Sequence, residues 1–311
     1  PSPKLSLFYL VLDIGYILDC IIFFFSIFCD IIISFGVNIM NRKEEIEHSI
    51  ITKYRKKIWS PFMKAIRDFE LIKEGDKIAV CISGGKDSML LAKCLEELKK
   101  HGKVPFELVY LVMDPGYQEK NLKQIKENLK TLGIDATIFQ NNIFQVADSS
   151  SQKRNDNPCY LCARMRRGAL YDKAKSLGCN KIALGHHMND VIETVLLNLI
   201  WNGQVSSMMP KLHSDHFEGM ELIRPLYYVK ENYIKSWART NHLAFIDCAC
   251  SVTKKGDGKR IVVKKLVDDL CEIHEDADLN LLTATKNVNL NTLLAYKKGN
   301  EIHHFLDEYD K

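Results

Sequence analysis

The sequence predicts an α/β fold built on a doubly wound parallel sheet, with helical additions at the N- and C-terminal ends. Short β-branched runs alternate with longer stretches in which apolar residues recur at helical spacing, and a glycine-rich turn joins the first such run to the first such stretch. With 311 residues, 46% of them hydrophobic, the chain is long enough for one sizeable domain and its appendages.

The predicted elements follow one another in the order that a doubly wound sheet requires. A helical segment over 44–74 carries an apolar stripe, and a turn signal at 74–76 separates it from the first strand. We predict strands at 77–82, 106–113, 136–139 and 181–184, and helices around 90–98, 122–132 and 164–177. Residues 264–296 are predicted to form helices with a charged, solvated face.

The first 39 residues differ in composition from the rest of the chain. They are almost entirely apolar from Leu5 to Ile39, which would suit a membrane anchor. Three carboxylates oppose this interpretation, because each costs about 2.5 to 3.5 kcal/mol near the centre of a bilayer: Asp13, Asp19 and Asp30. A polar, amphipathic stretch begins at Met40, as at an ordinary cytosolic N-terminus. We interpret 1–39 as an extension foreign to the functional fold, with an anchor as the alternative, and expect a cytoplasmic protein.

Charge and cysteine content narrow the class of protein. Residues 40–311 carry 42 basic and 36 acidic side chains, a net charge of +6 that permits an RNA partner without demanding one. The ten cysteines are spread through the chain, and several stand in apolar runs, which argues against a disulfide scaffold. In a reducing cytosol, closely spaced cysteines more often bind metal or do redox chemistry.

The segment 83–88, Ser-Gly-Gly-Lys-Asp-Ser, is a candidate phosphate loop. Glycines between a buried strand and a helix let backbone N–H groups approach an anion, and the helix N-terminus adds partial positive charge. The loop is not a Walker A motif, because Val80 stands where that motif needs glycine and Asp87 where it needs serine or threonine. The alternative is a tight turn with a capping serine.

Two pairs of cysteines are candidate metal ligands. Cys159 and Cys162 form a CxxC pair at the start of a predicted helix, and Cys248 and Cys250 follow later in the chain. Three or four of these sulfurs would suit zinc or an iron–sulfur cluster, and their spacing does not choose between the two. Three arginines follow the first pair and are placed to bind phosphates of RNA or of ATP: Arg164, Arg166 and Arg167.

A second polar element, Gly-His-His-Met-Asn-Asp-Val-Ile-Glu-Thr at 185–194, follows the predicted strand 181–184. Gly185 would allow close approach of the backbone to a ligand. Asp190 and Glu193 resemble a capping box, in which Asp190 caps the following helix and still points at a metal. His213 and His216 are interpreted as ordinary surface histidines on a loop after Pro210.

These motifs together resemble the tRNA 2-thiocytidine synthetase family of PP-loop ATP pyrophosphatases. The similarity covers about residues 40–289 and is carried by SGGxDS at 83–88, PCxLCxRxRRGxLY from Pro158, GHHxxDxxET from Gly185, Arg224-Pro225-Leu226, and Pro115-Gly116-Tyr117 in place of PGF. The resemblance implies cleavage of ATP to AMP and pyrophosphate with Mg²⁺. It also implies a homodimer, a tRNA substrate and a sulfur donor such as a cysteine desulfurase.

The resemblance further implies a [4Fe-4S] cluster held by Cys159, Cys162 and Cys248, with one iron left open for sulfur. The C-terminal match is imperfect: the family has PCxxC where this chain has Asp247-Cys248-Ala249-Cys250, so Cys250 is the alternative third ligand. Zn²⁺ is the alternative metal. The remaining cysteines are interpreted as core filling.

Site residues carried over from the family fall into three groups. The nucleotide-binding group is Ser83, Gly84, Gly85, Lys86, Asp87, Ser88, Met113, Gly185 and His186. The catalytic group is Lys86, Asp87 and Asp190, and the RNA-binding group is the three arginines at 164, 166 and 167. The predicted segments are an apolar extension over 1–39, a helical segment over 40–74, a PP-loop domain with the cysteine site over 75–253, and a helical tail over 254–311.

The resemblance implies formation of 2-thiocytidine in the anticodon loop of tRNA. Adenylation of the base C2 oxygen would precede sulfur transfer. The alternatives are another PP-loop reaction on tRNA, of the 2-thiouridine or lysidine type, and a zinc-stabilised RNA-binding protein that senses nucleotide.

Overall fold

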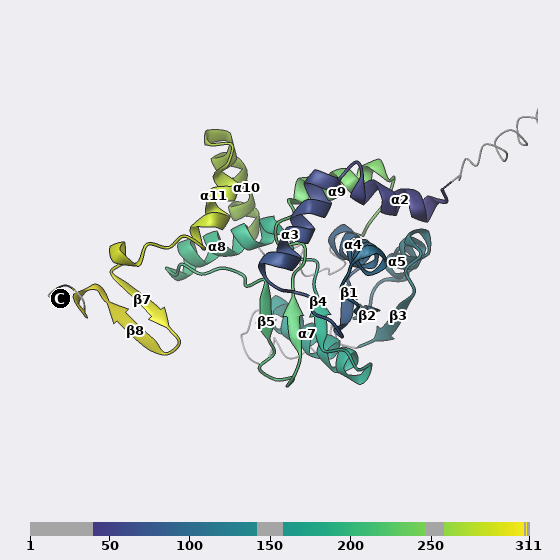
Figure 1. Ribbon diagram of the computed structural model, residues 1–311, viewed down its shortest axis with the longest axis horizontal. Helices are drawn as coiled ribbons and strands as arrows, with labels where there is room; N and C mark the ends of the chain where they lie inside the picture. Colours follow the sequence, from purple (N-terminus) through teal and green to yellow (C-terminus); the bar gives the residue numbers. More distant parts are fainter. Residues whose placement is uncertain (1–39, 142–157, 247–257, 308, 310–311) are drawn as a thin grey trace, which may run out of the picture. The chain divides into compact units, whose positions relative to one another are not determined.

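The four predicted strands and two further ones form a six-stranded sheet in the order β3-β2-β1-β4-β6-β5 (Figure 1). The structure is a computed structural model that describes residues 40–141, 158–246, 258–307 and 309, except for the side chains of 158–164. The strands are β1 (Lys77–Ile82), β2 (Glu107–Asp114), β3 (Ala136–Gln140), β4 (Lys181–Ala183), β5 (Lys211–His213) and β6 (Glu221–Ile223). Neighbouring strands are parallel except β5 and β6. The predicted doubly wound parallel sheet is confirmed, whereas strands β5 and β6, and the antiparallel pairing between them, were not predicted.

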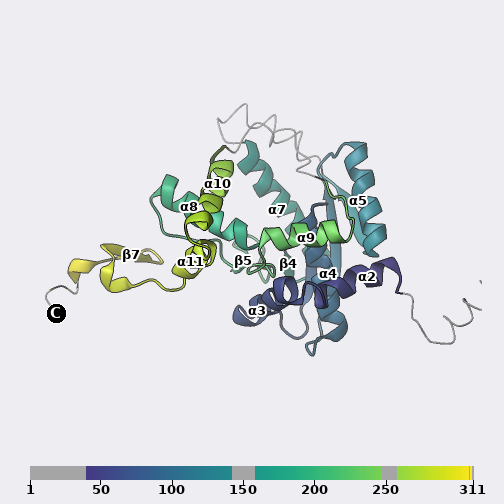
Figure 2. The same ribbon diagram turned by 90° about the horizontal axis from the view of Figure 1, so that it is seen from above.

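Both faces of the sheet are covered, which explains the continuous apolar character of β1. Ile78, Val80 and Ile82 point into the larger core, whereas Ala79 and Cys81 point into a smaller core on the other face. The flanking helices are α4 (Lys86–His101), α5 (Glu119–Leu132), α7 (Pro158–Ser176), α8 (Met188–Asn202) and α9 (Glu231–Thr240). Helix α7 packs on the smaller core and α4 on the larger one, on opposite sides of the strands (Figure 2).

The order of the strands reverses between β1 and β4. From β1 the chain moves outward through α4 and α5 to β2 and β3, and α7 then leads to β4 on the other side of β1. At such a switch point the connections leave the carboxyl ends of the two strands in opposite directions and open a crevice there, where ligands of α/β sheets bind. The phosphate loop follows β1, and the histidine element follows β4.

The N-terminal helical segment is built from α2 (Arg42–Ile51), a π-helical turn η1 (Arg55–Trp59) and α3 (Ser60–Asp68). Its predicted apolar stripe packs on the core, where Phe62 is fully buried. The Tyr54 hydroxyl lies 3.0 Å from that of Ser236 and 2.8 Å from that of Thr240, both on α9. The segment is therefore joined to the core by packing and by hydrogen bonds.

The C-terminal part begins with α10 (Gly258–Ile273) and α11 (Ala277–Ala284), which pack on α8. The prediction of helices over 264–296 is confirmed for these two and wrong past Ala284. There the chain forms the 3-10 turn η2 (Leu290–Thr292), the antiparallel hairpin of β7 (Ala295–Lys298) and β8 (Glu301–His304), and η3 (Phe305–Asp307). Gly299, with φ of 64°, supplies the left-handed conformation in the two-residue turn.

No helix within the described ranges has both the length and the hydropathy that crossing a bilayer requires. The apolar segment 1–39 lies outside those ranges, so its interpretation remains a prediction.

A buried ion-pair network holds the amino ends of the central strands. The Lys181 ammonium lies 2.7 Å from the Asp76 carboxylate, 3.1 Å from that of Glu221 and 3.0 Å from the Leu71 carbonyl oxygen. Lys181 is 2% exposed and Asp76 5% exposed. Burial alone would raise the pKa of Asp76, but hydrogen bonds from Lys181, the Lys73 amide and Asn180 hold it below its ordinary value. This network ties β4 to the segments around it.

We expect Lys181→Met to lower the free energy of unfolding by about 3 to 5 kcal/mol, because Asp76 would stay buried without its cation. Urea denaturation at pH 7 measures the loss. Adding Asp76→Asn should restore part of it, since the uncompensated charge is then removed. If Lys181→Met lowered the free energy of unfolding by less than about 1 kcal/mol, the ion pair would contribute no more than a solvent-exposed one.

Candidate nucleotide-binding site

The two glycines of the phosphate loop have different structural roles. Gly84 has φ of 86°, and a Cβ there would lie 2.6 Å from Cγ1 of Ile125 and 2.9 Å from Cδ1 of Ile246. Conformation and packing therefore both require glycine at this position. Gly85 has an ordinary φ of −83°, and the nearest neighbour of a Cβ there would be the Ser83 hydroxyl at 3.6 Å. Space is thus left over Gly85, where an anion would approach.

Two serine hydroxyls fix the shape of the loop. The Ser88 hydroxyl accepts the Ser83 N–H at 3.1 Å and donates to the Gly85 carbonyl oxygen at 3.0 Å. The two hydroxyls lie 3.2 Å apart. Ser88 is buried and Ser83 exposed. As at any helix N-terminus, the first N–H groups of α4 have no acceptors within the helix, which suits an anionic ligand at this end.

Gly185 places the end of β4 against the phosphate loop. A Cβ at Gly185 would lie 2.9 Å from the Ser88 nitrogen and 3.0 Å from the Asp87 carbonyl carbon. In the structure Gly185 closely approaches the backbone of the loop, and its approach to a ligand stays a prediction. Without a side chain at this position, two separate segments meet at the switch point.

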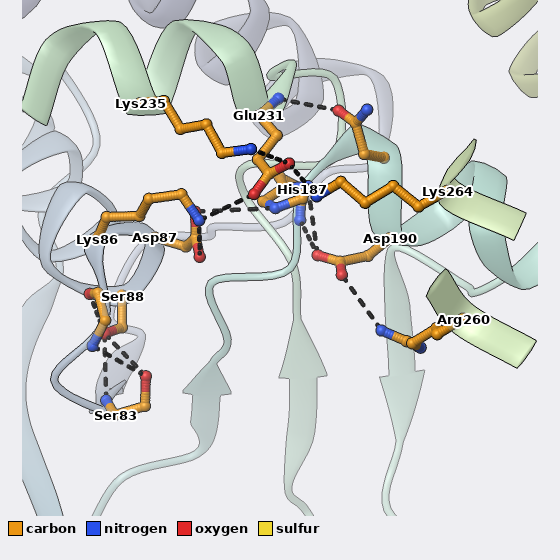
Figure 3. A network of polar contacts seen from close by, with 12 residues as sticks. Ser83, Lys86, Asp87, Ser88, His187, Asp190, Glu231, Lys235, Arg260 and Lys264 are labelled. Atoms are coloured by element: carbon orange, nitrogen blue, oxygen red, sulfur yellow. Dashed lines mark hydrogen bonds and ion pairs between the residues drawn. The ribbon is translucent and has the colours of Figure 1, made fainter. Parts of the chain in front are cut away.

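Lys86 lies between two carboxylates at the start of α4 (Figure 3). Its ammonium is 3.2 Å from the Asp87 carboxylate and 3.1 Å from that of Glu231 on α9. Burial opposes the charge, but Asp87 and Glu231 keep the pKa of Lys86 above its ordinary value. Lys86 is therefore a fixed cation beside the loop.

His187 lies between Asp87 and Asp190. Its Nε2 is 3.8 Å from Oδ1 of Asp87, and its Nδ1 is 3.4 Å from Oδ2 of Asp190. That Asp190 oxygen also accepts the backbone N–H of His187 at 2.9 Å. Oδ1 of Asp87 is buried and has no hydrogen-bond donor among the described residues. A buried carboxylate oxygen without a donor is suited to a hard cation such as Mg²⁺.

The capping interaction differs from the predicted one. Asp190 caps α8 by accepting the N–H of His187, so it is the third residue of the helix rather than its N-cap. Glu193 takes no part in capping. It is buried on α8, 3.9 Å from the Arg260 guanidinium of α10, and burial together with the Asp190 charge raises its pKa.

His186 is a neutral imidazole at the same edge of the sheet. Burial and the neighbouring Arg224, Arg260 and His187 lower its pKa to about 4, against the opposing effect of Asp190. Its Nδ1 is buried, with no hydrogen-bond partner in the part of the chain that the structure describes. At pH 7, His186 can donate or accept a hydrogen bond without adding charge.

Arg224, of the Arg-Pro-Leu motif, is buried just after β6. Its guanidinium donates to the Met209 carbonyl oxygen. Burial and the nearby Arg167 lower its pKa to about 10, so it stays a cation at pH 7. A hydrogen-bonded cation therefore lies beside the histidine element.

The turn after β2 lies beside the phosphate loop. Met113 is buried near the end of this strand, and the Asp114 carboxylate accepts the N–H groups of Gly116 and Tyr117 at 2.9 and 2.7 Å. The Tyr117 hydroxyl is 3.4 Å from the Ser83 carbonyl oxygen. The segment that resembles the family's PGF thus contacts the loop.

The predicted metal ligands lie largely outside the described part of the molecule. Cys159 and Cys162 stand in the first turns of α7, but their side chains and that of Arg164 are not described, and Cys248 and Cys250 fall in 247–257. Within the described ranges, no group of three or more His, Cys, Asp or Glu side chains is placed to hold a metal. The described free cysteines fit the interpretation as core filling: Cys81, Cys94 and Cys179 are buried, and Cys271 is half-buried.

Sequence reasoning missed three charged residues of the site, namely Glu231, Arg260 and Lys264. Glu231 is separated from Lys86 by more than a hundred residues. Arg260 and Lys264 belong to a helix whose charged residues are typical of an ordinary solvent-exposed face. Of the three, only Glu231 carries a local signal, because it is an acidic residue at the first position of a helix. Such a residue stabilises the helix N-terminus, so the signal does not indicate ligand binding.

We expect Gly85→Ala to fold normally and to weaken ATP binding roughly tenfold or more, because its methyl group displaces the anion from the loop N–H groups. Gly185→Ala instead forces the backbone of β4 away from the loop and lowers the free energy of unfolding by about 1 to 3 kcal/mol. Calorimetric titration and urea unfolding of both variants separate the two effects. Unchanged ATP affinity in Gly85→Ala would mean that the loop is only a tight turn.

The depressed pKa of His186 predicts a pH effect on stability. The unfolded chain protonates this residue near its ordinary value of about 6.5, whereas the folded chain does so near 4. Its contribution to stability is present above pH 6.5 and is lost as the pH falls to 4, by at most about 1.4 kcal/mol per pH unit. Urea unfolding should therefore show that acidification lowers the free energy of unfolding less in His186→Gln than in the wild type. An NMR titration of His186 centred near 6.5 would contradict this.

Comparison with known proteins identifies a PP-loop domain in this chain and several relatives. The family model of the PP-loop domain matches residues 52–255. The tRNA-cytidine(32) 2-sulfurtransferase of Citrifermentans bemidjiense is 37% identical over 250 residues, which cover 80% of this chain and 95% of that protein. The enzyme of the same name from Geobacter sulfurreducens is 38% identical over 239 residues, 77% of this chain and 92% of its own.

Among solved structures, the U34-tRNA thiolase NcsA from Methanococcus maripaludis with its [4Fe-4S] cluster has a TM-score of 0.57. Its sequence is 22% identical, the match covers 73% of this chain and 76% of that one, and it shows a shared fold. The resemblance predicted from the motifs is confirmed by the family model and by the relatives. The chain belongs to the tRNA-cytidine(32) 2-sulfurtransferase family of PP-loop enzymes.

Proposed function

We propose that this protein uses ATP to thiolate a cytidine in the anticodon loop of tRNA, forming 2-thiocytidine. The observation that carries the proposal is the phosphate loop at the switch point, with open space over Gly85 and the Lys86 cation beside it. Relatives named tRNA-cytidine(32) 2-sulfurtransferase share 37 to 38% of their residues with this chain over most of their length.

Activation of the base is the step that the described residues support best. The C2 oxygen of cytidine is a poor leaving group, so its direct replacement by sulfur has a high barrier. In the proposed reaction this oxygen attacks the α phosphorus of ATP, the bond to the bridging oxygen breaks, and pyrophosphate leaves. The loop N–H groups and Lys86 hold the β and γ phosphates in line and neutralise the departing charge.

The carboxylates suit a magnesium ion. Asp87 has a buried oxygen without a donor, and Asp190 lies across His187 from it. Bound Mg²⁺ would supply Lewis-acid charge to the triphosphate. In this arrangement His187 keeps the two carboxylates apart and oriented, and neutral His186 offers a hydrogen bond to the phosphates or to the base.

Sulfur delivery rests on residues whose side chains are not described. We assign Cys159, Cys162 and Cys248 as ligands of a [4Fe-4S] cluster, with Cys250 as the alternative third ligand and Zn²⁺ as the alternative metal. When bound, the cluster would supply the site that holds the sulfur which replaces the oxygen at C2, so that AMP leaves.

Two features of the described chain support this assignment. Cys159 and Cys162 are three residues apart in the first turns of α7, the CxxC spacing that is typical of metal ligands. Ile246, the last described residue before the Cys248 segment, packs toward Gly84 of the phosphate loop. The described chain therefore reaches the phosphate loop directly before the segment 247–257 begins.

The proposed partners follow from the same assignment. Arg164, Arg166 and Arg167 continue α7 directly after the cysteine pair and would bind tRNA phosphates. A sulfur donor such as a cysteine desulfurase, and a homodimeric assembly, belong to the proposal as well.

The decisive experiment places the chain in cells that lack their own tRNA 2-thiocytidine synthetase and measures tRNA nucleosides by mass spectrometry. We expect 2-thiocytidine to return with the wild-type chain. Cys159→Ala should abolish it while leaving ATP binding intact, because the ligand is lost and the loop is not. Cys271→Ala, half-buried on α10, is the matched control and should restore 2-thiocytidine fully.

Each contrary result points to a specific error. Normal thiolation by Cys159→Ala would refute the cysteine assignment. A wild-type chain that changes no thiolated cytidine, yet releases pyrophosphate with tRNA, would indicate another PP-loop reaction. The absence of tRNA-dependent pyrophosphate release would indicate a nucleotide-sensing RNA-binding protein.

A further inference from the structure

Helix α10 begins beyond the residues that match the PP-loop domain, yet it brings two cations to the nucleotide site. The Arg260 guanidinium lies 3.6 Å from the Asp190 carboxylate, and the Lys264 ammonium lies 2.7 Å from that of Glu231 (Figure 3). Val263 and Val267 of the same helix are buried, which keeps α10 in place. The catalytic edge of the sheet is thus completed by a helix from the C-terminal part.

Glu231 connects this helix to the phosphate loop. One of its carboxylate oxygens lies 3.1 Å from the Lys86 ammonium. The other accepts from Lys264 at 2.7 Å and from Lys235 at 2.9 Å. The backbone N–H of Glu231 donates to the Asn189 side chain of α8 at 2.9 Å. With a side chain only 12% exposed, Glu231 is held in position by groups from four helices.

Glu231 is the carboxylate that three lysines share. Three ammonium groups surround the single Glu231 carboxylate, and Asp87 is the other carboxylate on Lys86. Burial alone would raise the pKa of Glu231, but the three lysines hold it well below its ordinary value, so it is an anion at neutral pH. Glu231 is therefore a charged partner for Lys86 beside the loop.

We propose that Glu231 is a positioning residue for ATP: it holds the Lys86 ammonium beside the phosphate loop, and Lys264 of α10 holds Glu231. Lysine has a long, flexible side chain, and fixing it before the ligand arrives reduces the entropy lost on binding. Helix α10 thereby becomes part of the nucleotide site. The inference rests on the proposed function only in naming ATP as the ligand.

The same ion pair could act in the opposite sense, by holding Lys86 away from the phosphates. The two senses differ in sign: removal of the Glu231 charge weakens ATP binding if Glu231 positions Lys86, and strengthens it if Glu231 withdraws Lys86. The direction of the change in affinity therefore decides between them.

Binding of ATP and of AMP to the purified full chain, without tRNA, tests the proposal by calorimetric titration. We expect Glu231→Gln to raise the Kd for ATP roughly tenfold or more, the usual cost of losing a charged hydrogen-bond partner. The Kd for AMP should stay unchanged, because AMP lacks the phosphates that Lys86 faces. A general disturbance of the fold would instead weaken the binding of both ATP and AMP.

A second variant tests whether α10 acts through Glu231. Lys264→Met removes a half-exposed side chain and should raise the Kd for ATP by a smaller factor, about threefold. The double variant Glu231→Gln/Lys264→Met should bind no worse than Glu231→Gln alone, because Lys264 would act only by holding Glu231. Lys265→Met removes the exposed neighbouring charge on α10 and is the control, with an unchanged Kd.

Unchanged or tighter ATP binding by Glu231→Gln would overturn the positioning role. If that variant fails to fold, the Lys264→Met result decides: wild-type affinity would overturn the proposal. If the increases in Kd of the two single variants multiply in the double variant, the proposed action of α10 through Glu231 would be overturned. A wild-type chain that binds no ATP would instead overturn the proposed function, a result distinct from all of these.

Discussion

The close packing of Gly185 against the phosphate loop is the constraint on which the rest of the site depends. β1 and β4 are neighbours whose connections run in opposite directions, and their carboxyl ends must still meet for the loop and the histidine element to act together. A Cβ at Gly185 would fall within about 3 Å of three backbone atoms of Asp87 and Ser88. The lack of a side chain here sets the distance between the Lys86–Asp87 pair and the His187–Asp190 pair.

Once these segments are that close, electrostatics determines their arrangement. Carboxylates and cations alternate along the edge of the sheet: Asp190 and Glu193 face Arg260, and Glu231 faces three lysines. Partly buried charges need such partners, because desolvation otherwise disfavours the charged form. His186 shows the opposite outcome, since burial first and neighbouring cations second lower its pKa and keep it neutral.

The additions outside the sheet serve the site as well as the core. Helices α2 and α3 cover the larger core with their apolar stripe, and Tyr54 links this cover to α9, the helix that begins at Glu231. Helix α10 approaches the same position from the C-terminal side. Helix α9 is thus held in its C-terminal half by Tyr54 and at its first residue by Lys264 of α10, which limits the freedom of the Glu231 carboxylate that contacts Lys86.

The sequence by itself determined the elements whose cause is local. The continuous apolar run 77–82 specified a strand buried on both faces, the glycine pair specified the loop, and the motifs identified the family. The Gly-Asn turn at 299–300 was an available hairpin signal that the prediction of a helical tail over 254–311 overlooked. Only the tertiary structure decided that Glu231, Arg260 and Lys264 belong to the site, and that Gly185 contacts the loop. It also decided that Asp190 caps α8 from the third helical position, by accepting the N–H of His187, rather than as the N-cap. The physical reason is that ion pairs and backbone contacts between distant segments depend on where the sheet and helices bring them, and no local periodicity or spacing encodes that distance.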